Sequence, residues 1–214
     1  MRTVLVAVLF AASGAALAQS ADVGLVNLVS GDVTYAPASG APGKVQPFMR
    51  VRDGDRFDLP AGAQLRIILF AAARQERWTG PASFRASAKA SEPLAGKPAE
   101  VTNLPATAPQ RIARVPDLLT NAKLGGIQVR GGISPRQQAS LDQQGAVREA
   151  RKVYEQIRAQ FPSDDITPEL YLYSALHEYL LYDEMKIVVA DMLRKQPEND
   201  ELRKLESWVR SRVR

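Results

Sequence analysis

The spacing of hydrophobic positions changes about halfway along the chain, and this change divides the protein into two predicted parts. In residues 22–104, short apolar runs are separated by turn signals such as Gly31-Asp32, Asp53-Gly54 and Gly80-Pro81. Turns spaced about eight to twelve residues apart are typical of a small all-β sandwich or barrel. From residue 133 onward, apolar residues recur at the three- and four-residue spacing of amphipathic helices. The pattern therefore predicts an α+β protein.

Individual strands of the first part can be placed. The turn signals bound predicted strands at Arg56–Leu59 and at the apolar run Gln64–Phe70. The next stretch alternates across Trp78, breaks at a Gly-Pro pair and resumes at Ser83–Ala86.

A segment of different composition joins the two parts. From Ser87 to about Val115 the chain is rich in Ala, Pro, Lys and Ser, which predicts loop structure with one possible strand at Glu100–Leu104. The sequence "VPDLLTNAKLGG" predicts a short helix, and "IQVRGG" predicts a strand that returns to the sheet. We therefore assign residues 105–132 to a connector.

Residues 133–214 contain several helix start signals. Ser134 and Thr167 each precede a proline, which predicts an N-cap followed by proline at the first helical position. Gly145 is predicted to interrupt the first helix, and Asn199 or Asp200 to cap the last one.

Two stretches of this helical part resemble each other. "VREARKVYEQIRAQFP" (Val147–Pro162) aligns with "YDEMKIVVADMLRKQP" (Tyr182–Pro197), and their equivalent residues Ala150 and Met185 are 35 positions apart. A period near 34 residues with two helices per unit is the tetratricopeptide arrangement. Residues 134–214 therefore resemble tetratricopeptide repeats, although Met185 stands where that family has a small residue. The alternative is a plain stack of antiparallel helical hairpins.

The number of repeats constrains how this part is stabilised. The sequence contains about two units and a final helix, whereas about three repeats are needed for an independent solenoid. We therefore expect the helices to pack on the β part or on a second copy, which makes the protein a possible homo-oligomer.

The β part has a resemblance of its own. The segments "GDVTYAP", "VRDGDRFDLPAGAQLRIIL" and "RWTGPASF" resemble the FecR-type periplasmic domain over about Leu25–Phe84. The best-known members of that family carry a cytoplasmic segment and a membrane helix before this domain. Here a predicted signal peptide leads directly into it, so the resemblance implies a protein-binding β module outside the cytoplasm and not a transmembrane signalling role.

Residues 1–18 have the pattern of a secretory signal peptide. Arg2 precedes the apolar run "VLVAVLFAA", and "ALA" predicts cleavage after Ala18. An uncleaved anchor is the alternative, but Val4–Leu17 is shorter than the roughly 20 residues of a membrane span. We expect a periplasmic protein with no stable membrane insertion after cleavage.

Composition excludes several classes of chemistry. The chain of 214 residues has no Cys and one His, so thiol nucleophiles, disulfides and His-based metal clusters are excluded. No nucleophile or phosphate-binding motif occurs. The three Asp residues of "DGDRFD" (residues 53–58) are more typical of a β-turn than of a calcium loop. We expect no enzyme activity, no cofactor and no metal.

The net charge and its distribution limit the classes of partner that the protein could bind. The net charge of +5 is spread along the chain apart from the final "RSRVR", and export makes nucleic acid an unsuitable partner. We predict a non-enzymatic protein–protein interaction module that binds an envelope protein. The alternatives are a self-assembling envelope scaffold and a protein that binds cell-wall polymer.

The tetratricopeptide resemblance also implies which residues contact the partner. Its register places Leu170, Ser174, His177 and Glu178 on the concave side of the helices. Trp78, beside a Gly-Pro turn, is a further candidate, with coverage of the sheet edge as the alternative role.

Overall fold

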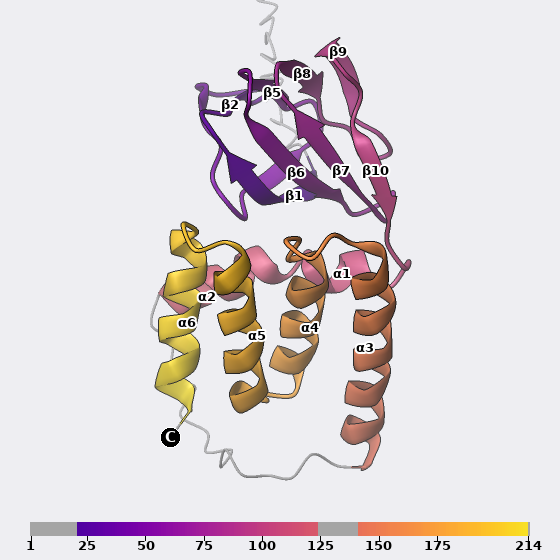
Figure 1. The fold of residues 1–214 in the computed structure, drawn as a ribbon, viewed down its shortest axis with the longest axis vertical. Helices are drawn as coiled ribbons and strands as arrows, with labels where there is room; N and C mark the ends of the chain where they lie inside the picture. Colours follow the sequence, from indigo (N-terminus) through magenta and orange to yellow (C-terminus); the bar gives the residue numbers. More distant parts are fainter. Residues whose placement is uncertain (1–20, 124–140, 214) are drawn as a thin grey trace, which may run out of the picture.

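The computed structural model describes residues 21–123 and 141–213, which form two five-stranded antiparallel sheets followed by a group of helices (Figure 1). The strands are β1 (Asp22–Ser30), β2 (Thr34–Ala36), β3 (Gly43–Lys44), β4 (Arg50–Arg52), β5 (Arg56–Leu59), β6 (Gln64–Leu69), β7 (Arg74–Thr79), β8 (Ala82–Arg85), β9 (Glu92–Gly96) and β10 (Glu100–Asn103). The helices are α1 (Ala108–Ile112), α2 (Val115–Lys123), α3 (Leu141–Gln160), α4 (Thr167–Glu178), α5 (Tyr182–Lys195) and α6 (Asp200–Arg212). The α+β prediction is confirmed.

The two sheets face each other across an apolar core. Sheet A has the order β10-β7-β6-β1-β4, and sheet B has the order β3-β2-β5-β8-β9. Aromatic rings fill the centre: Phe84 stacks on Phe57 at 5.0 Å and on Trp78 at 4.1 Å between centroids. Offset stacking of this kind adds to the burial of large apolar area.

Strand β6 is covered on both of its faces, which explains why its sequence is almost continuously apolar. Leu65, Ile67 and Leu69 point into the core between the sheets, whereas Ile68 belongs to the core shared with the helices. A strand with one solvated face would alternate between apolar and polar residues, and a doubly covered strand does not.

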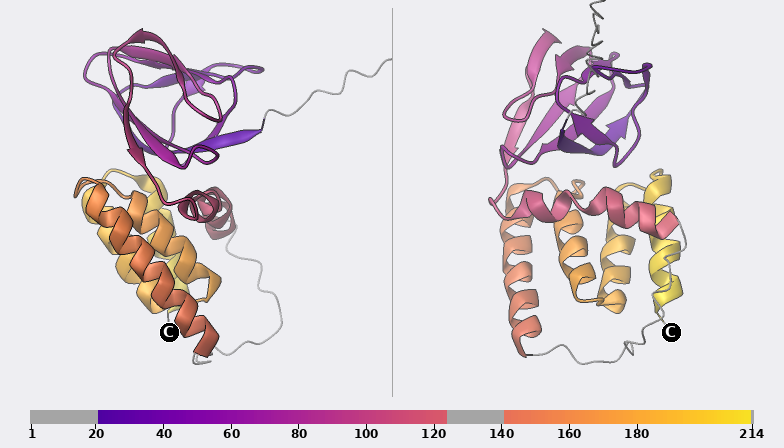
Figure 2. Two further views of the ribbon diagram at one scale, coloured as in Figure 1. Left: turned by 90° about the vertical axis from the view of Figure 1, so that its right-hand side faces the viewer. Right: turned by 180° about the vertical axis from the view of Figure 1, so that it is seen from behind.

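Helices α3 to α6 lie side by side, and α1 and α2 cross them on one side, close to the β-sheets (Figures 1 and 2). Each consecutive pair from α3 to α6 is in contact, and α1 packs on α4 while α2 packs on α6. Their apolar faces form one core; that of α5, for example, contributes Met185, Val188, Val189 and Met192. None of the helices in the described ranges is long and apolar enough to cross a membrane.

A buried polar network joins sheet A to the loop between α3 and α4. Asn27 and Gln75 both donate to the Thr167 hydroxyl, at 2.7 and 2.8 Å, and Gln75 also donates to Asp165 at 2.9 Å. Arg66, which is 3% exposed, forms an ion pair with Asp165 at 3.2 Å. We call these five residues the junction network. Because each is buried and bonded, the network fixes the helices on the sheet.

Most predicted strand and helix positions are confirmed, and β5 has the predicted bounds Arg56–Leu59. Strand β10 confirms the strand predicted at Glu100–Leu104, and α2 confirms the short helix predicted in the connector. The loop prediction for the rest of Ser87 to Val115 is wrong, because β9 and α1 form there. The predicted strand at "IQVRGG" and the predicted cap at Ser134 lie outside the described residues.

Two predictions about the helices are wrong. Helix α3 runs through Gly145 without interruption, at a position open enough for a side chain. Thr167 does not cap α4, because its hydroxyl accepts hydrogen bonds from sheet A; Asp165 instead accepts from the Thr167 backbone N–H at 2.8 Å. At α6 the expected capping role belongs to Asn199, which accepts from the N–H groups of Glu201 and Leu202.

Candidate functional site

The candidate site is the surface of α4 and α6 that α1 and α2 cross, which we call the inner face (Figure 2). The N-terminal ends of α4 and α6 lie near sheet A, as the bonds from Asn27 to Thr167 and from Gln196 to the Asn27 carbonyl show. The C-terminal ends of both helices are therefore remote from the sheets. The inner face thus has a near half beside the β-sheets and a far half at the other end.

The near half is occupied by the chain itself. Residues Ala108 and Ile112 of α1 and Val115 of α2 are fully buried and share a core with Leu170 of α4. Segment 108–123 therefore takes the position that a bound peptide would need, and the near half is closed to an external partner.

Ion pairs hold α1 over α4. Arg111 and Arg114 contact the Glu178 carboxylate at 3.1 and 2.6 Å, and the Arg111 guanidinium lies 5.7 Å from the centre of the Tyr171 ring. The Glu178 side chain is 25% exposed, so solvent screens these pairs only in part. They orient α1 across the inner face.

The structure corrects three of the five residues predicted to contact a partner. Leu170 is 0% and Ser174 is 2% exposed, because α4 is enclosed by its neighbouring helices and by the connector helices. Trp78 is 1% exposed, because its ring stacks on Phe84 between the sheets and covers no edge. His177 and Glu178 remain accessible in part.

The far half carries a group of aromatic rings around His177. The imidazole stacks on Trp208 of α6 at 5.8 Å and lies 6.5 Å from Tyr173, while Tyr182 meets Trp208 edge-on at 6.0 Å. We call these four residues the aromatic cluster. His177, Tyr182 and Trp208 are each half-buried, so part of the cluster is open to solvent.

Several polar atoms in and beside the cluster have no hydrogen-bond partner among the described residues. They are the Tyr173 hydroxyl, the Ser174 hydroxyl and the Trp208 indole nitrogen, all of them buried. Buried polar groups in folded proteins are nearly always hydrogen-bonded, so three unpaired donors in one region distinguish it from an ordinary helix contact.

Electrostatics add two features to the cluster. Burial lowers the pKa of His177, which keeps the ring neutral near pH 7, although the neighbouring Glu178 opposes this effect. Burial also raises the pKa of Tyr173, so its hydroxyl keeps its proton. The Arg212 guanidinium lies 5.4 Å from the centre of the Trp208 ring and adds a positive charge at the rim.

Within the described ranges no group of three or more His, Asp or Glu side chains could hold a metal ion. In the acidic turn at residues 53–58, Asp55 accepts a hydrogen bond from the Arg52 N–H at 2.9 Å and Asp53 accepts one from the Ala88 N–H at 3.2 Å. The aromatic cluster offers stacking surface and hydrogen-bond donors.

Sequence reasoning identified His177 and Glu178 but missed Tyr182, Trp208 and Arg111. The sequence prediction gave the last helix no role beyond following the two repeat units. A tryptophan between Leu205 and Val209 was the available signal, because it continues the apolar stripe of α6 onto the inner face.

Comparisons with known proteins give no relative. The chain matches no protein-family model, no curated protein and no solved structure.

Proposed function

We propose that this chain is an exported, non-enzymatic protein–protein interaction module of the bacterial cell envelope. In this proposal the β part is a FecR-like domain, the helices are a short tetratricopeptide-like array, and the partner contacts the far half of the inner face. The observation that carries it is the aromatic cluster, where half-buried rings lie beside buried donors that have no hydrogen-bond partner. Aromatic residues with a polar edge are enriched in protein interfaces, and Trp and Tyr often dominate their energetics.

The occupied near half refines the predicted mode of binding. A partner segment lying along the whole inner face would have to displace Ile112 and Val115, which are fully buried. A partner confined to the far half meets His177 and Trp208 without displacing Ile112 and Val115. We therefore propose a short contact segment that packs an apolar side chain against the exposed edges of these stacked rings.

A photo-crosslinking amino acid at position 177 in intact cells tests this proposal. Position 187 is the matched control, because Ile187 of α5 is 71% exposed and takes part in none of the ring contacts of the cluster. We expect one envelope protein to crosslink at 177 and not at 187, and the Trp208→Ala variant, crosslinked from the same position, to lose it. Equal crosslinking at both positions would rule out the site, and crosslinks to a second copy of the chain would favour the scaffold alternative.

A further inference from the structure

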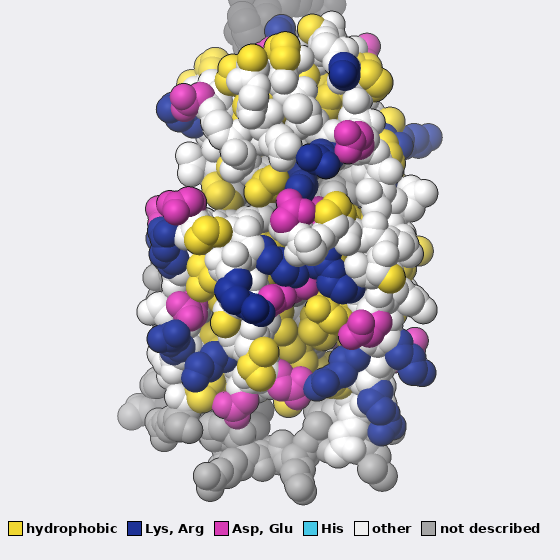
Figure 3. Space-filling model, in the orientation of Figure 1, with side chains coloured by type: hydrophobic (Ala, Val, Ile, Leu, Met, Phe, Trp, Pro, Cys, Tyr) yellow, Lys and Arg dark blue, Asp and Glu magenta, His cyan; other side chains and the backbone are white. Residues whose placement is uncertain are grey.

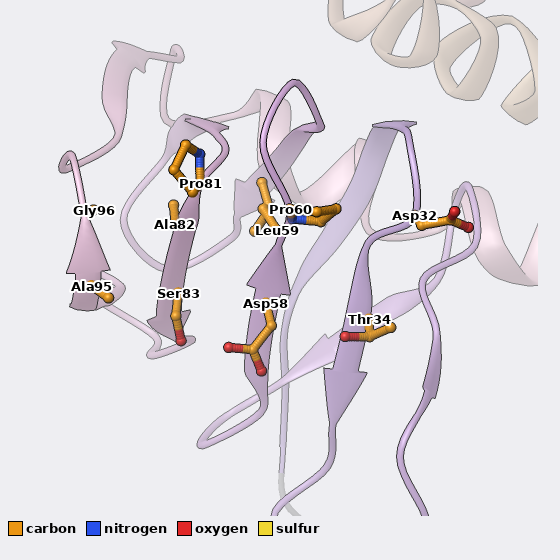
Figure 4. Close-up of a pocket in the computed structure, with 10 residues that line it drawn as sticks. All are labelled: Asp32, Thr34, Asp58, Leu59, Pro60, Pro81, Ala82, Ser83, Ala95 and Gly96. Carbon is orange, nitrogen blue, oxygen red and sulfur yellow. The ribbon is translucent and has the colours of Figure 1, made fainter.

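A second surface, on the opposite side of the β-sandwich from the helices, has the character of a ligand site. The outer face of sheet B carries an open depression of about 700 Å³ where β2, β5, β8 and β9 meet (Figure 4). This volume lies within the usual range of small-molecule sites, about 300–1,000 Å³. The surface shown in Figure 3, by contrast, has acidic, basic and hydrophobic side chains interspersed over the sheets and the helices.

Three oxygen-bearing side chains form a row across the depression. Thr34 of β2 lies opposite Asp58 of β5, and Asp58 lies opposite Ser83 of β8. Directly opposed residues of an antiparallel pair share one side of the sheet, with Cβ atoms about 5 Å apart. Figure 4 shows the three side chains on adjacent strands along the depression.

Ser83 is the observation that indicates a ligand. Its side chain lines the depression and the residue is only 7% exposed, yet none of the residues that the structure describes hydrogen-bonds to its hydroxyl. Leaving a buried hydroxyl unpaired is unfavourable, so a ligand group bound there gains a hydrogen bond without displacing an existing one.

One side of the depression is apolar. Pro60 and Pro81 lie beside the row of oxygens, at the end of β5 and the start of β8. Gly96 of β9 has φ +84°, and a Cβ atom there would lie 2.4 Å from the Pro81 carbonyl oxygen. Glycine is therefore required for β9 to approach β8 this closely, and this approach forms one side of the depression.

Charge and topology restrict the class of ligand. Asp58 is paired with Arg56 at 3.1 Å and Asp32 with Lys44 at 2.8 Å, so the acidic groups of the depression are already balanced. Strands β5 and β8 are hydrogen-bonded to neighbours on both sides, so a peptide strand cannot add to their backbones. The remaining acceptors, Thr34, Asp58 and Ser83, suit a neutral ligand rich in hydroxyl groups.

We propose that this depression binds a neutral oligosaccharide. Sugar hydroxyls donate to the Asp58 carboxylate and bond to the Ser83 and Thr34 hydroxyls, and the apolar side of a sugar ring packs on Pro60 and Pro81. The site is separate from the inner face of the helices and does not depend on the protein partner proposed above. In an envelope protein it would bring a glycan and a protein partner to opposite ends of one molecule.

Titration calorimetry on the full mature chain tests the proposal, with oligomers of N-acetylglucosamine as the neutral probe. We expect saturable binding that Ser83→Ala and Asp58→Asn each weaken about five- to tenfold, the loss typical of one hydrogen bond to a ligand. Ser91→Ala is the matched control, because Ser91 is also buried with an unpartnered hydroxyl but lies outside the depression. It should bind like the wild type.

Three results would overturn the proposal. They are the absence of binding to the wild-type chain, equal binding by the Ser83→Ala and wild-type chains, and binding of an oligolysine peptide in place of the glycan. The Ser83→Ala chain should melt at or slightly above the wild-type temperature, because the hydroxyl it removes is buried and bonds to none of the described residues. A melting temperature no lower than that of the wild type makes a loss of binding attributable to the site.

Discussion

Replacing Asp165 by Ala should weaken the attachment of the helices to sheet A. The effect should be larger than that of replacing any other carboxylate in the loop between α3 and α4. The Asp165 carboxylate is 1% exposed and accepts from Arg66 at 3.2 Å, from Gln75 at 2.9 Å and from the Thr167 N–H at 2.8 Å. Its removal leaves the Arg66 guanidinium, 3% exposed, with Asp164 as its remaining acidic partner at 2.7 Å.

The remaining ion pair between Arg66 and Asp164 sets how much unfolding free energy the Asp165→Ala chain loses. Removing one partner of a buried ion pair costs about 3–5 kcal/mol, and the retained contact with Asp164 keeps the loss near 3 kcal/mol. In a chain of this size such a loss lowers the melting temperature by about 6–12 °C. Scanning calorimetry of the full chain measures it directly.

Asp164→Ala provides the control for this experiment. Asp164 contacts the same guanidinium, but its side chain is 60% exposed, so its removal should cost under about 1 kcal/mol. If the Asp165→Ala and Asp164→Ala chains melt within about 2 °C of each other, the junction network does not stabilise the protein in the way the burial of its members implies.

Three further changes test other parts of the structure. Trp78→Ala should cost about 3–5 kcal/mol in a urea titration, because it empties the stack on Phe84, and a loss under about 1 kcal/mol would contradict its burial. Gly145→Ala should stabilise the chain by about 0.5–1 kcal/mol, because alanine is a better helix former and the position inside α3 has space for its side chain. A lower urea midpoint would show that glycine is needed there. Burial lowers the pKa of His177, so the unfolded chain binds a proton at this residue more readily than the folded chain does. The free energy of unfolding should therefore fall as the pH drops below about 6.5, and His177→Gln should flatten this dependence. Identical pH slopes for the two chains would show that His177 does not cause the pH dependence.

Local signals in the sequence were sufficient for most of the β part. The turns at Gly31, Gly54 and Gly62 need a positive φ, which glycine adopts without strain, and they fixed the ends of the neighbouring strands. Helix α6 was likewise predictable from its start, because Asn199 caps through its own side chain. These features depend on residues adjacent in the chain.

Features that depend on distant residues were missed. Thr167 carries a strong capping pattern, but its hydroxyl bonds to Asn27 and Gln75, which are 140 and 92 positions away. Leu170 was assigned to an open surface because nothing in the sequence of α4 shows that Ile112 covers it. Burial created by another segment cannot be predicted from the periodicity of one helix.

The same limit applies to the candidate sites. Sequence reasoning found His177 from its helical register, but the ring that stacks on it, Trp208, lies on another helix. The row of Thr34, Asp58 and Ser83 depends on strand register, which two long-range pairings set together.

The position of α1 and α2 on the inner face affects how tightly any peptide can bind there. Both helices are part of the chain that forms the face, so they compete with an incoming peptide as a tethered ligand does. A short tether gives an effective concentration in the millimolar range. A free peptide at micromolar concentration must therefore have an intrinsic affinity about a thousandfold higher than that of the segment to replace it on the near half. On the far half, where His177, Tyr182 and Trp208 are only half-buried in the part of the chain that the structure describes, modest affinity is sufficient, and a weak, reversible partner can be retained.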